Sequence, residues 1–159
     1  MMVKTFIEST KPIEIRKASP EFESGLARYF EALVSAGDDR TFHPHKLSAE
    51  GAQEIANYQG KDLYYLLVTG SDVVGYGMLR GWEEGCEIPS IGASIHPNAQ
   101  GLGLGRLLMN FLHVAARQRG AKKIRAKAYK HNKTSIEMLK ALGYTFEDYR
   151  NEYLCYLDI

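Results

Sequence analysis

Apolar and polar residues follow two different periods along this chain. Alternation or short apolar runs predict β-strands over residues 13–17, 63–69, 73–79, 87–95, 124–129, 144–149 and 153–157. Apolar residues that recur every three to four positions predict helices over residues 20–36, 48–58, 104–119 and 133–142. The predicted order is β-α-α-β-β-β-α-β-α-β-β, which is an α/β (α+β mixed-sheet) fold rather than a regular doubly wound one.

Residues with strong conformational preferences mark the ends of several predicted helices. Ser19 precedes Pro20, and Ser48 precedes the second helix; both serines are residue types that cap a helix N-terminus. Gly143 follows the last helix and is typical of a helix C-terminus. The third helix has the clearest apolar face, which we expect to be buried: Leu104, Leu107, Leu108, Phe111, Leu112, Ala115 and Ala116.

The predicted strand over residues 87–95 contains two irregular positions. Pro89 cannot donate to a sheet ladder, and Gly92 lies within an otherwise regular pattern. A glycine in a strand often marks a bulge or a close approach of another backbone. We therefore expect a bulge near Gly92.

Composition is that of an ordinary globular protein. The 159 residues are 45% hydrophobic and 25% charged, and we expect one domain over residues 1–159. The sequence has no apolar run near 18 residues, so we expect no transmembrane helix, and residues 1–8 lack the apolar segment of a secretory signal, so we expect no secretion. Cys86 and Cys155 are isolated, so we expect free thiols, no metal pair and a cytoplasmic location.

The small net charge of +1 conceals a local excess of basic residues. Residues 97–140 contain ten Lys or Arg residues and one acid, Glu137. A basic segment of this kind indicates a polyanionic ligand, either a nucleic acid or a phosphorylated cofactor, although a solvated helix face has the same composition. The acidic remainder of the chain favours a positively charged second ligand.

Three alternating glycines lie in Gln100-Gly101-Leu102-Gly103-Leu104-Gly105-Arg106, immediately before the third helix. Backbone N–H groups at a helix start lack partners and lie at the positive end of the helix dipole, so such a turn can bind a phosphate. The alternative is a turn that only connects strand to helix. The sequence excludes two other phosphate-binding motifs. Arg106 stands where a dinucleotide-binding fingerprint needs glycine, and the Gly-Lys-Ser/Thr of a P-loop is absent.

Three motifs together resemble the GNAT family of N-acetyltransferases. Gln100–Gly105 matches the family's acetyl-CoA loop, Q/R-x-x-G-x-G/A, and Ile95-His96-Pro97 resembles its V-x-P element. Asn132-Lys133-Thr134-Ser135 followed by Ala141-Leu142-Gly143-Tyr144 is similar to its N-x-x-A…x-x-G-F/Y motif. The motifs span residues 87–146, and the predicted order of elements fits the same family.

The resemblance implies a binding site for acetyl-CoA. The fourth and fifth strands would separate, backbone groups of the fourth would pair with the pantetheine arm, and N–H groups of the glycine turn would hold the pyrophosphate. Arg106, Lys130 and Lys133 would then lie near the phosphates. The residues expected to contact acetyl-CoA are Ala93, Ser94, Ile95, Gln100, Gly101, Leu102, Gly103, Leu104, Gly105, Arg106 and Asn132.

The resemblance also implies direct attack of an amine on the thioester, which needs a base and an acid for the departing thiolate. Many family members carry a tyrosine seven residues after the motif asparagine, but Leu139 stands there. Tyr129 and Tyr144 are the nearby tyrosines; Tyr144 is expected in the core, which leaves Tyr129 or solvent as the acid.

Three residues are candidates for the base or for substrate binding. Glu87 is expected at the start of the strand that lines the cleft, although an exposed strand-end carboxylate has the same sequence signature. His43 and His45 lie in the loop that borders the acceptor site in this family, and imidazoles titrate in the useful range.

The sequence therefore predicts an N-acetyltransferase that uses acetyl-CoA and acts on a small-molecule or peptide amine. The alternatives are a CoA-binding regulatory domain without catalysis, favoured by Leu139, and a nucleic-acid-binding module. We expect no nucleic-acid or membrane partner, and the resemblance allows a homodimer.

Overall fold

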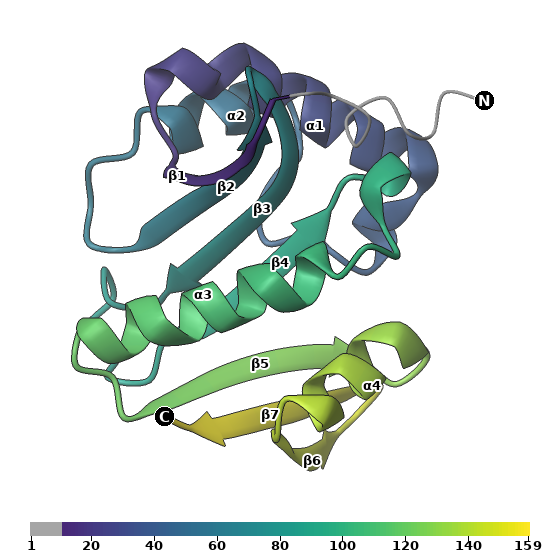
Figure 1. The fold of residues 1–159 in the computed structure, drawn as a ribbon. Coiled ribbons are helices and arrows are strands. Elements are labelled where there is room, and N and C mark those ends of the chain that lie inside the picture. Colours follow the sequence, from purple (N-terminus) through teal and green to yellow (C-terminus); the bar gives the residue numbers. More distant parts are fainter. Residues whose placement is uncertain (1–10) are drawn as a thin grey trace.

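The computed structural model describes residues 11–159, which form one seven-stranded sheet flanked by helices on both faces (Figure 1). The strand order is β1-β2-β3-β4-β5-β7-β6, and β4 and β5 are the parallel pair among antiparallel neighbours. The strands are β1 (Ile13–Lys17), β2 (Leu63–Thr69), β3 (Asp72–Arg80), β4 (Ser90–Ile95), β5 (Lys123–Tyr129), β6 (Thr145–Tyr149) and β7 (Glu152–Asp158). The α-helices are α1 (Glu23–Ala36), α2 (Ala49–Ala56), α3 (Leu104–Gln118) and α4 (Lys133–Ala141), with short 3-10 turns η1 (Pro20–Phe22), η2 (Asp38–Arg40) and η3 (Pro97–Ala99).

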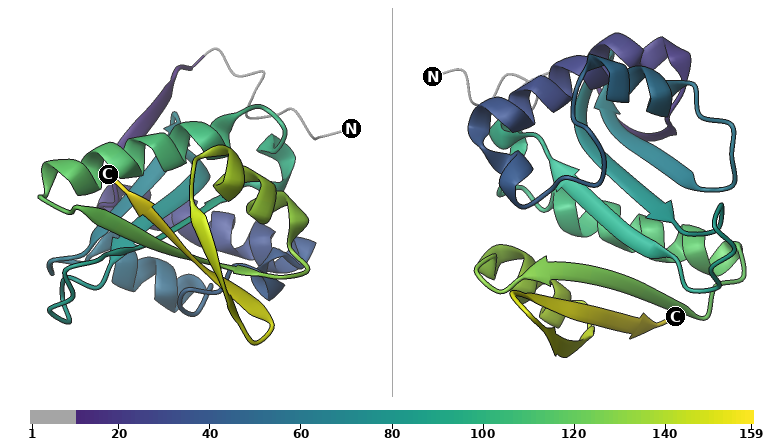
Figure 2. Two further views of the ribbon diagram at one scale, coloured as in Figure 1. Left: turned by 90° about the horizontal axis from the view of Figure 1, so that it is seen from below. Right: turned by 180° about the vertical axis from the view of Figure 1, so that it is seen from behind.

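Two hydrophobic clusters hold the helices against opposite faces of the sheet. Helices α1 and α2 pack on β2 and β3 through a cluster centred on Tyr29, Phe30 and Tyr76. Helices α3 and α4 pack on the other face, against β3, β4, β5 and β7, through Leu108, Leu112 and residues of those strands. The rotated views show α3 on one side and α1 on the other, with β4 between them (Figure 2). Each face of β4 therefore borders a different helical layer.

The predicted order of elements is confirmed, and most differences are at element ends. Ser48 caps α2 as expected, since its Oγ accepts a hydrogen bond from the Gly51 N–H at 3.1 Å. Ser19 makes no side-chain cap; Pro20 instead begins the 3-10 turn η1 that precedes α1. Helix α2 ends at Ala56 rather than near residue 58.

The buried face of α3 is rotated slightly from the predicted one. Leu107 is 48% exposed, whereas Met109 and His113 are buried. The buried stripe is centred on Leu104, Leu108 and Leu112. At 100° per residue, Leu107 lies 60° from Leu104 around the helix axis, and it is therefore at the side of this stripe. The expectation for Leu107 was therefore wrong.

The predicted bulge at Gly92 is absent. The β3–β4 register runs from Gly75↔Ile95 to Arg80↔Ser90 without a shift. Strand β4 also begins at Ser90 rather than Glu87, and residues 87–89 lie in the preceding loop. Gly92 instead leaves room for the Met78 side chain, 3.5 Å from where a Cβ would lie.

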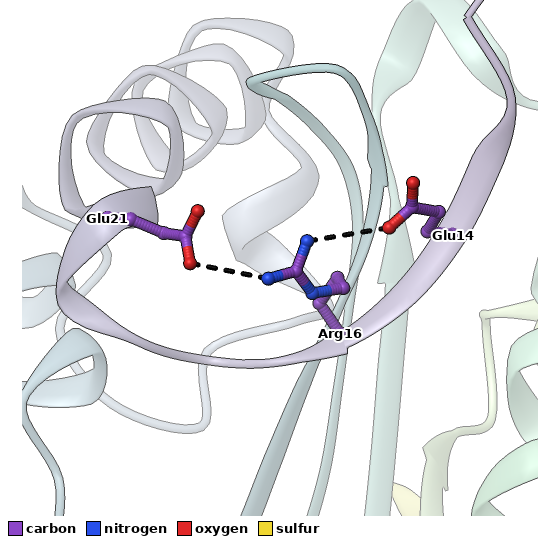
Figure 3. Close-up of polar contacts among 3 residues, drawn as sticks. All are labelled: Glu14, Arg16 and Glu21. Carbon is purple, nitrogen blue, oxygen red and sulfur yellow. Dashed lines mark hydrogen bonds and ion pairs between the residues drawn. The ribbon is translucent and has the colours of Figure 1, made fainter.

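The outer strand β1 is charged and tied to the turn after it. Arg16 lies between Glu14 and Glu21, with nitrogen–oxygen distances of 3.4 and 3.3 Å (Figure 3). Its guanidinium also lies 5.1 Å from the centre of the Phe22 ring. Exposed pairs of this kind contribute little stability, but charged side chains on an edge strand oppose pairing with other chains.

Among residues 11–159, no helix combines the length and apolar character needed to cross a bilayer.

Candidate active site

A wedge-shaped cleft opens between the two parallel strands β4 and β5. The strands share the register pair Ser90↔Arg125, where the Arg125 N–H donates to the Pro89 carbonyl at 3.0 Å. The Arg125 side chain also donates twice to Ser90 Oγ, at 2.8 and 3.2 Å. Beyond this junction the strands diverge around a cavity of about 1060 Å³. The predicted separation of these strands is therefore present, and it needs no bulge.

The cleft is bordered by a different set of side chains on each face of the sheet. Alternation places Ile91, Ala93 and Ile95 of β4 among the side chains packed with α3. Ser94 points the other way, because its Oγ hydrogen-bonds the Tyr29 hydroxyl of α1 at 2.7 Å. The two faces can therefore receive two different ligands that meet at β4.

Strand β5 divides its side chains in the same manner. Ala126 and Ala128 belong to the core beneath α3 and α4. Arg125, Lys127 and Tyr129 alternate with them, so they face the side of the sheet that α1 covers, and all three line the cavity. This side of the cleft is polar and charged.

The glycine turn lies at the wide end of the cleft. Gly101 and Gly103 have φ angles of +83° and +87°, a region that favours glycine, and a Cβ on either would meet nothing within 4 Å. Gly103 is the N-cap of α3 and makes no side-chain cap, and the first turn contains no acidic residue. The first helical bond runs from the Leu107 N–H to the Gly103 carbonyl, at 3.1 Å.

The N–H groups of residues 104–106 therefore lack partners within the helix, and Gly103, Leu104, Gly105 and Arg106 all line the cavity. An open helix N-terminus with a basic residue in its first turn suits an anion such as a pyrophosphate. Gln100 fixes the start of the turn, because its amide donates to the Ile95 carbonyl at 3.3 Å and to Asp38 at 3.4 Å.

The remaining predicted cofactor contacts border the cavity with one exception. Ala93, Ser94, Ile95 and Asn132 line it, whereas Leu102 is an exposed residue of the turn outside the lining. Asn132 is the N-cap of α4, and its Oδ1 accepts a hydrogen bond from the Ser135 N–H at 3.3 Å. A second helix N-terminus therefore lies at the same cleft as that of α3.

Of the three cations expected near phosphates, Arg106 alone is in the cavity wall. Lys130 instead forms an ion pair with Asp148 and lies 5.3 Å from the ring centre of Tyr153. Lys133 is exposed at the start of α4, outside the wall.

Two predicted catalytic residues lie together across the cleft. His43 Nε2 and the Tyr129 hydroxyl are 2.9 Å apart, in hydrogen-bond contact, although 86 residues separate them in sequence. Both line the cavity on the face covered by α1. The Tyr129 ring also stacks on His131, with 5.4 Å between ring centres and 18° between planes. The pair is well oriented and is reachable by a ligand in the cleft.

His45 has a different position and holds the loop that carries His43. Its Nε2 lies 2.7 Å from the Tyr76 hydroxyl and its Nδ1 lies 3.0 Å from the Lys46 carbonyl. Burial lowers its pKa, so the imidazole is neutral, donates from Nδ1 to the carbonyl and accepts the tyrosine proton at Nε2. His45 does not line the cavity, and Arg80 braces the same loop by donating to the Pro44 carbonyl at 2.9 Å.

Glu87 is exposed in the loop before β4 and does not line the cavity. The carboxylates that do line it are Asp38, Glu137 and Glu152. Glu152 pairs with Tyr129 in the β5–β7 ladder, which places both side chains on one face of the sheet. Glu152 is thus a further candidate for the base. It could not be predicted from the sequence, because its position depends on which strand lies beside β5.

Leu139 and Tyr144 occupy the positions expected for packed residues. Leu139 is 5% exposed, lines the cavity and supplies no proton. Tyr144 is buried, and its hydroxyl lies 2.7 Å from Nε2 of His113, so it is a core residue as expected. Tyr129 is the tyrosine of the two that reaches the cleft.

Comparison with known proteins matches this architecture. A profile of the acetyltransferase (GNAT) family matches residues 26–144. The GNAT domain of S. lividans PAT has a TM-score of 0.78 and 16% sequence identity, covering 92% of this chain and 90% of that one. PaiA N-acetyltransferase from Thermoplasma acidophilum, solved with coenzyme A, has a TM-score of 0.72 and 17% identity, covering 93% and 99%.

The ribosomal L7/L12 α-N-protein acetyltransferase RimL, also solved with coenzyme A, has a TM-score of 0.76 and 17% identity, covering 95% of this chain and 96% of that one. Identities this low show a shared fold. A search of curated proteins by sequence found no match.

The parallel strands that separate beside an open helix N-terminus define the class of acyl-CoA acyltransferase folds. Within that class, the chain belongs to the acetyltransferase (GNAT) family, whose profile spans most of its length. The predicted family, fold and enzyme class, an N-acetyltransferase, are confirmed.

Proposed function

We propose that the protein transfers an acetyl group from acetyl-CoA to the primary amine of a small molecule or peptide by direct attack. The observation that carries the proposal is the open N-terminus of α3, formed by Gly101 and Gly103, beside the cleft between β4 and β5. A long, flexible thioester with a pyrophosphate needs both an anion site and a narrow groove, and these two features are contiguous here.

The cofactor would lie along the face covered by α3 and α4. Backbone N–H groups of residues 103–106 would bind the pyrophosphate, and the backbone of Ala93, Ser94 and Ile95 would pair with the pantetheine arm. Strand β4 supports this role, because its β5-facing edge has one register pair with β5 and is otherwise open to a ligand. Asn132 would add a polar contact from the start of α4.

The acceptor would approach from the opposite face, which α1 and the loop 41–47 cover. This arrangement lets the amine and the thioester meet at β4 without a covalent enzyme intermediate. Direct transfer is supported by the cysteines: Cys155 is buried, Cys86 is exposed in the loop before β4, and neither lines the cavity.

Tyr129 and His43 would move the protons. The Tyr129 oxygen takes a proton from the incoming ammonium while its own proton passes to Nε2 of His43. When the carbon–sulfur bond breaks, the same pair returns one proton to the thiolate, and the second proton of the amine goes to solvent. Neither His45 nor Glu87 takes part in this scheme, because neither borders the cavity.

The test has two readouts. Acetyl-CoA should raise the thermal midpoint of the protein, and release of free thiol should depend on an added amine. Gln100→Ala removes the contact to the Ile95 carbonyl and should weaken acetyl-CoA binding, whereas Gln53→Ala on the distant helix α2 serves as the control. No midpoint shift at millimolar acetyl-CoA would refute the proposal.

A further inference from the structure

Three cations line the acceptor side of the cleft without a carboxylate partner. Arg80 ends β3 and pairs in register with Ser90, which pairs in turn with Arg125. The two arginines therefore flank Ser90 on neighbouring strands, at a backbone separation of roughly 10 Å. Lys127 follows two residues further along β5, on the same face, and all three line the cavity.

The hydrogen-bond partners of the two arginines are neutral. Arg80 donates to the Pro44 carbonyl, and Arg125 donates to the Ser90 hydroxyl. These bonds orient both guanidinium groups but leave their charge uncompensated, although both side chains are half-buried. The ion pairs among residues 11–159 lie elsewhere and involve Arg16, Lys123 and Lys130.

The carboxylates in the wall do not neutralise this group of cations. Asp38 is near Gln100, at the glycine turn. Glu137 belongs to α4, on the opposite side of the sheet, and Glu152 is opposite Tyr129 rather than Ser90. None is within 4.0 Å of a nitrogen of the three cations, since no such pair is found in the described part of the chain. Arg80 and Arg125 are half-buried charges without a counter-ion, which favours binding of an anion, and the exposed Lys127 adds a third positive charge beside them.

The phosphates of the cofactor would be too far away to fill this role. Strand β4 separates the cations at Ser90 from the glycine turn beyond Ile95. Five residue steps of a strand span roughly 17 Å. A pyrophosphate at the N-terminus of α3 therefore leaves the three cations open to the second substrate.

We propose that the acceptor is a small amine that also carries a carboxylate or phosphate group, held by Arg80, Arg125 and Lys127. The inference rests on the proposed acetyl transfer and narrows its acceptor. Planar guanidinium groups bind both oxyanions through paired hydrogen bonds, and a fixed anion would direct the amine toward β4. The acidic residues outside residues 97–140 predicted a positively charged acceptor. The positive charge of Arg80, Arg125 and Lys127 at the cleft favours an amine that also carries a negatively charged group.

Matched pairs of amines test the proposal. Phosphoethanolamine is compared with ethanolamine, and β-alanine with β-alaninamide, in the thiol-release assay with acetyl-CoA. The anionic member of at least one pair should have a kcat/KM at least about tenfold higher, and the pair identifies the anion as phosphate or carboxylate. Equal or faster turnover of the neutral member in both pairs overturns the proposal.

Variants locate the anion site. Lys127→Gln should raise the KM of the anionic acceptor about tenfold and leave the KM of acetyl-CoA unchanged, and Arg80→Gln should act in the same direction. Lys122→Gln removes an exposed lysine outside the cavity and serves as the control. An anion preference that survives both Lys127→Gln and Arg80→Gln contradicts the assignment.

Binding measurements test the anion site independently of turnover. If no amine is acetylated, the midpoint shift caused by each amine is measured with and without acetyl-CoA. A larger shift with the anionic member that is lost in Lys127→Gln supports the anion site, and equal shifts within each pair overturn it. Failure of acetyl-CoA itself to shift the midpoint refutes the proposed function instead, so the two failures are distinguishable.

Discussion

Replacing Gly103 by alanine tests whether the N-terminus of α3 binds the cofactor. Gly103 has a φ of +87°, and an added Cβ would meet no protein atom within 4 Å. The folded protein would therefore lose stability through backbone strain of about 1–2 kcal/mol rather than through a clash. Reduced freedom of the unfolded chain offsets about 0.4–1 kcal/mol of this. The net loss is about 1 kcal/mol, or roughly 2–4 °C in the thermal midpoint for a domain of this size.

The effect on acetyl-CoA binding should be larger than the effect on stability. The methyl group would lie at the N-cap of α3, where the open N–H groups begin. Loss of one hydrogen bond to a charged phosphate costs about 1.5–3 kcal/mol. The dissociation constant of acetyl-CoA, measured by titration calorimetry, should rise about ten- to a hundredfold.

Gly120 provides a matched control for Gly103. Its φ is +99°, a Cβ there would also meet nothing within 4 Å, and it follows the far end of α3, outside the cavity. Gly120→Ala should lose similar stability and bind acetyl-CoA as the unmodified protein does. The reasoning is refuted if Gly103→Ala keeps the original affinity, or if both variants lose affinity equally.

Three other predictions concern protons and packing. Tyr129→Phe should lower kcat about a hundredfold or more without loss of the fold, and adding His43→Gln should lower kcat little further because the two side chains act as one hydrogen-bonded unit; additive losses would contradict the pairing. Burial lowers the pKa values of His45 and His113 below their ordinary 6.5, so below that pH the unfolded chain binds more protons than the folded one. The contribution of these histidines to the free energy of unfolding should therefore be complete above pH 6.5 and decrease on acidification. His113→Gln should reduce this decrease, measured by urea titrations at pH 7 and pH 5. Leu139→Ala should lower the free energy of unfolding by about 2–3 kcal/mol, because the side chain is buried but borders an open cleft; a change below about 1 kcal/mol would contradict this.

The order of elements could be predicted because each has a strong local signal. The apolar period of α3, the serine before α2 and the glycine after α4 depend on residues a few positions apart. The misplaced start of β4 and the absent bulge have a different origin. Pro89 and Gly92 suggested an irregular strand, but pairing with β3 fixes a regular register, and the separation from β5 depends on the Ser90–Arg125 junction.

Most residues on the cofactor side of the site could be predicted from the sequence, whereas the arrangement of the acceptor side could not. Gln100 to Arg106 are contiguous, so their chemistry could be read as one motif. His43 and Tyr129 were separate candidates, and their contact depends on how the loop 41–47 folds over β5. Arg80, Lys127 and Glu152 come from three different strands, so their common position follows from the strand order alone.

Amide NMR of the protein titrated with coenzyme A tests the central claim most directly. If the cofactor binds at the N-terminus of α3 and along β4, the N–H signals of Gly101, Gly103 and Ala93 should move and saturate at a one-to-one ratio, while those of the outer strands β1 and β6 stay in place. Unchanged glycine signals, or shifts confined to the basic residues near the C-terminal end of α3, would contradict the account.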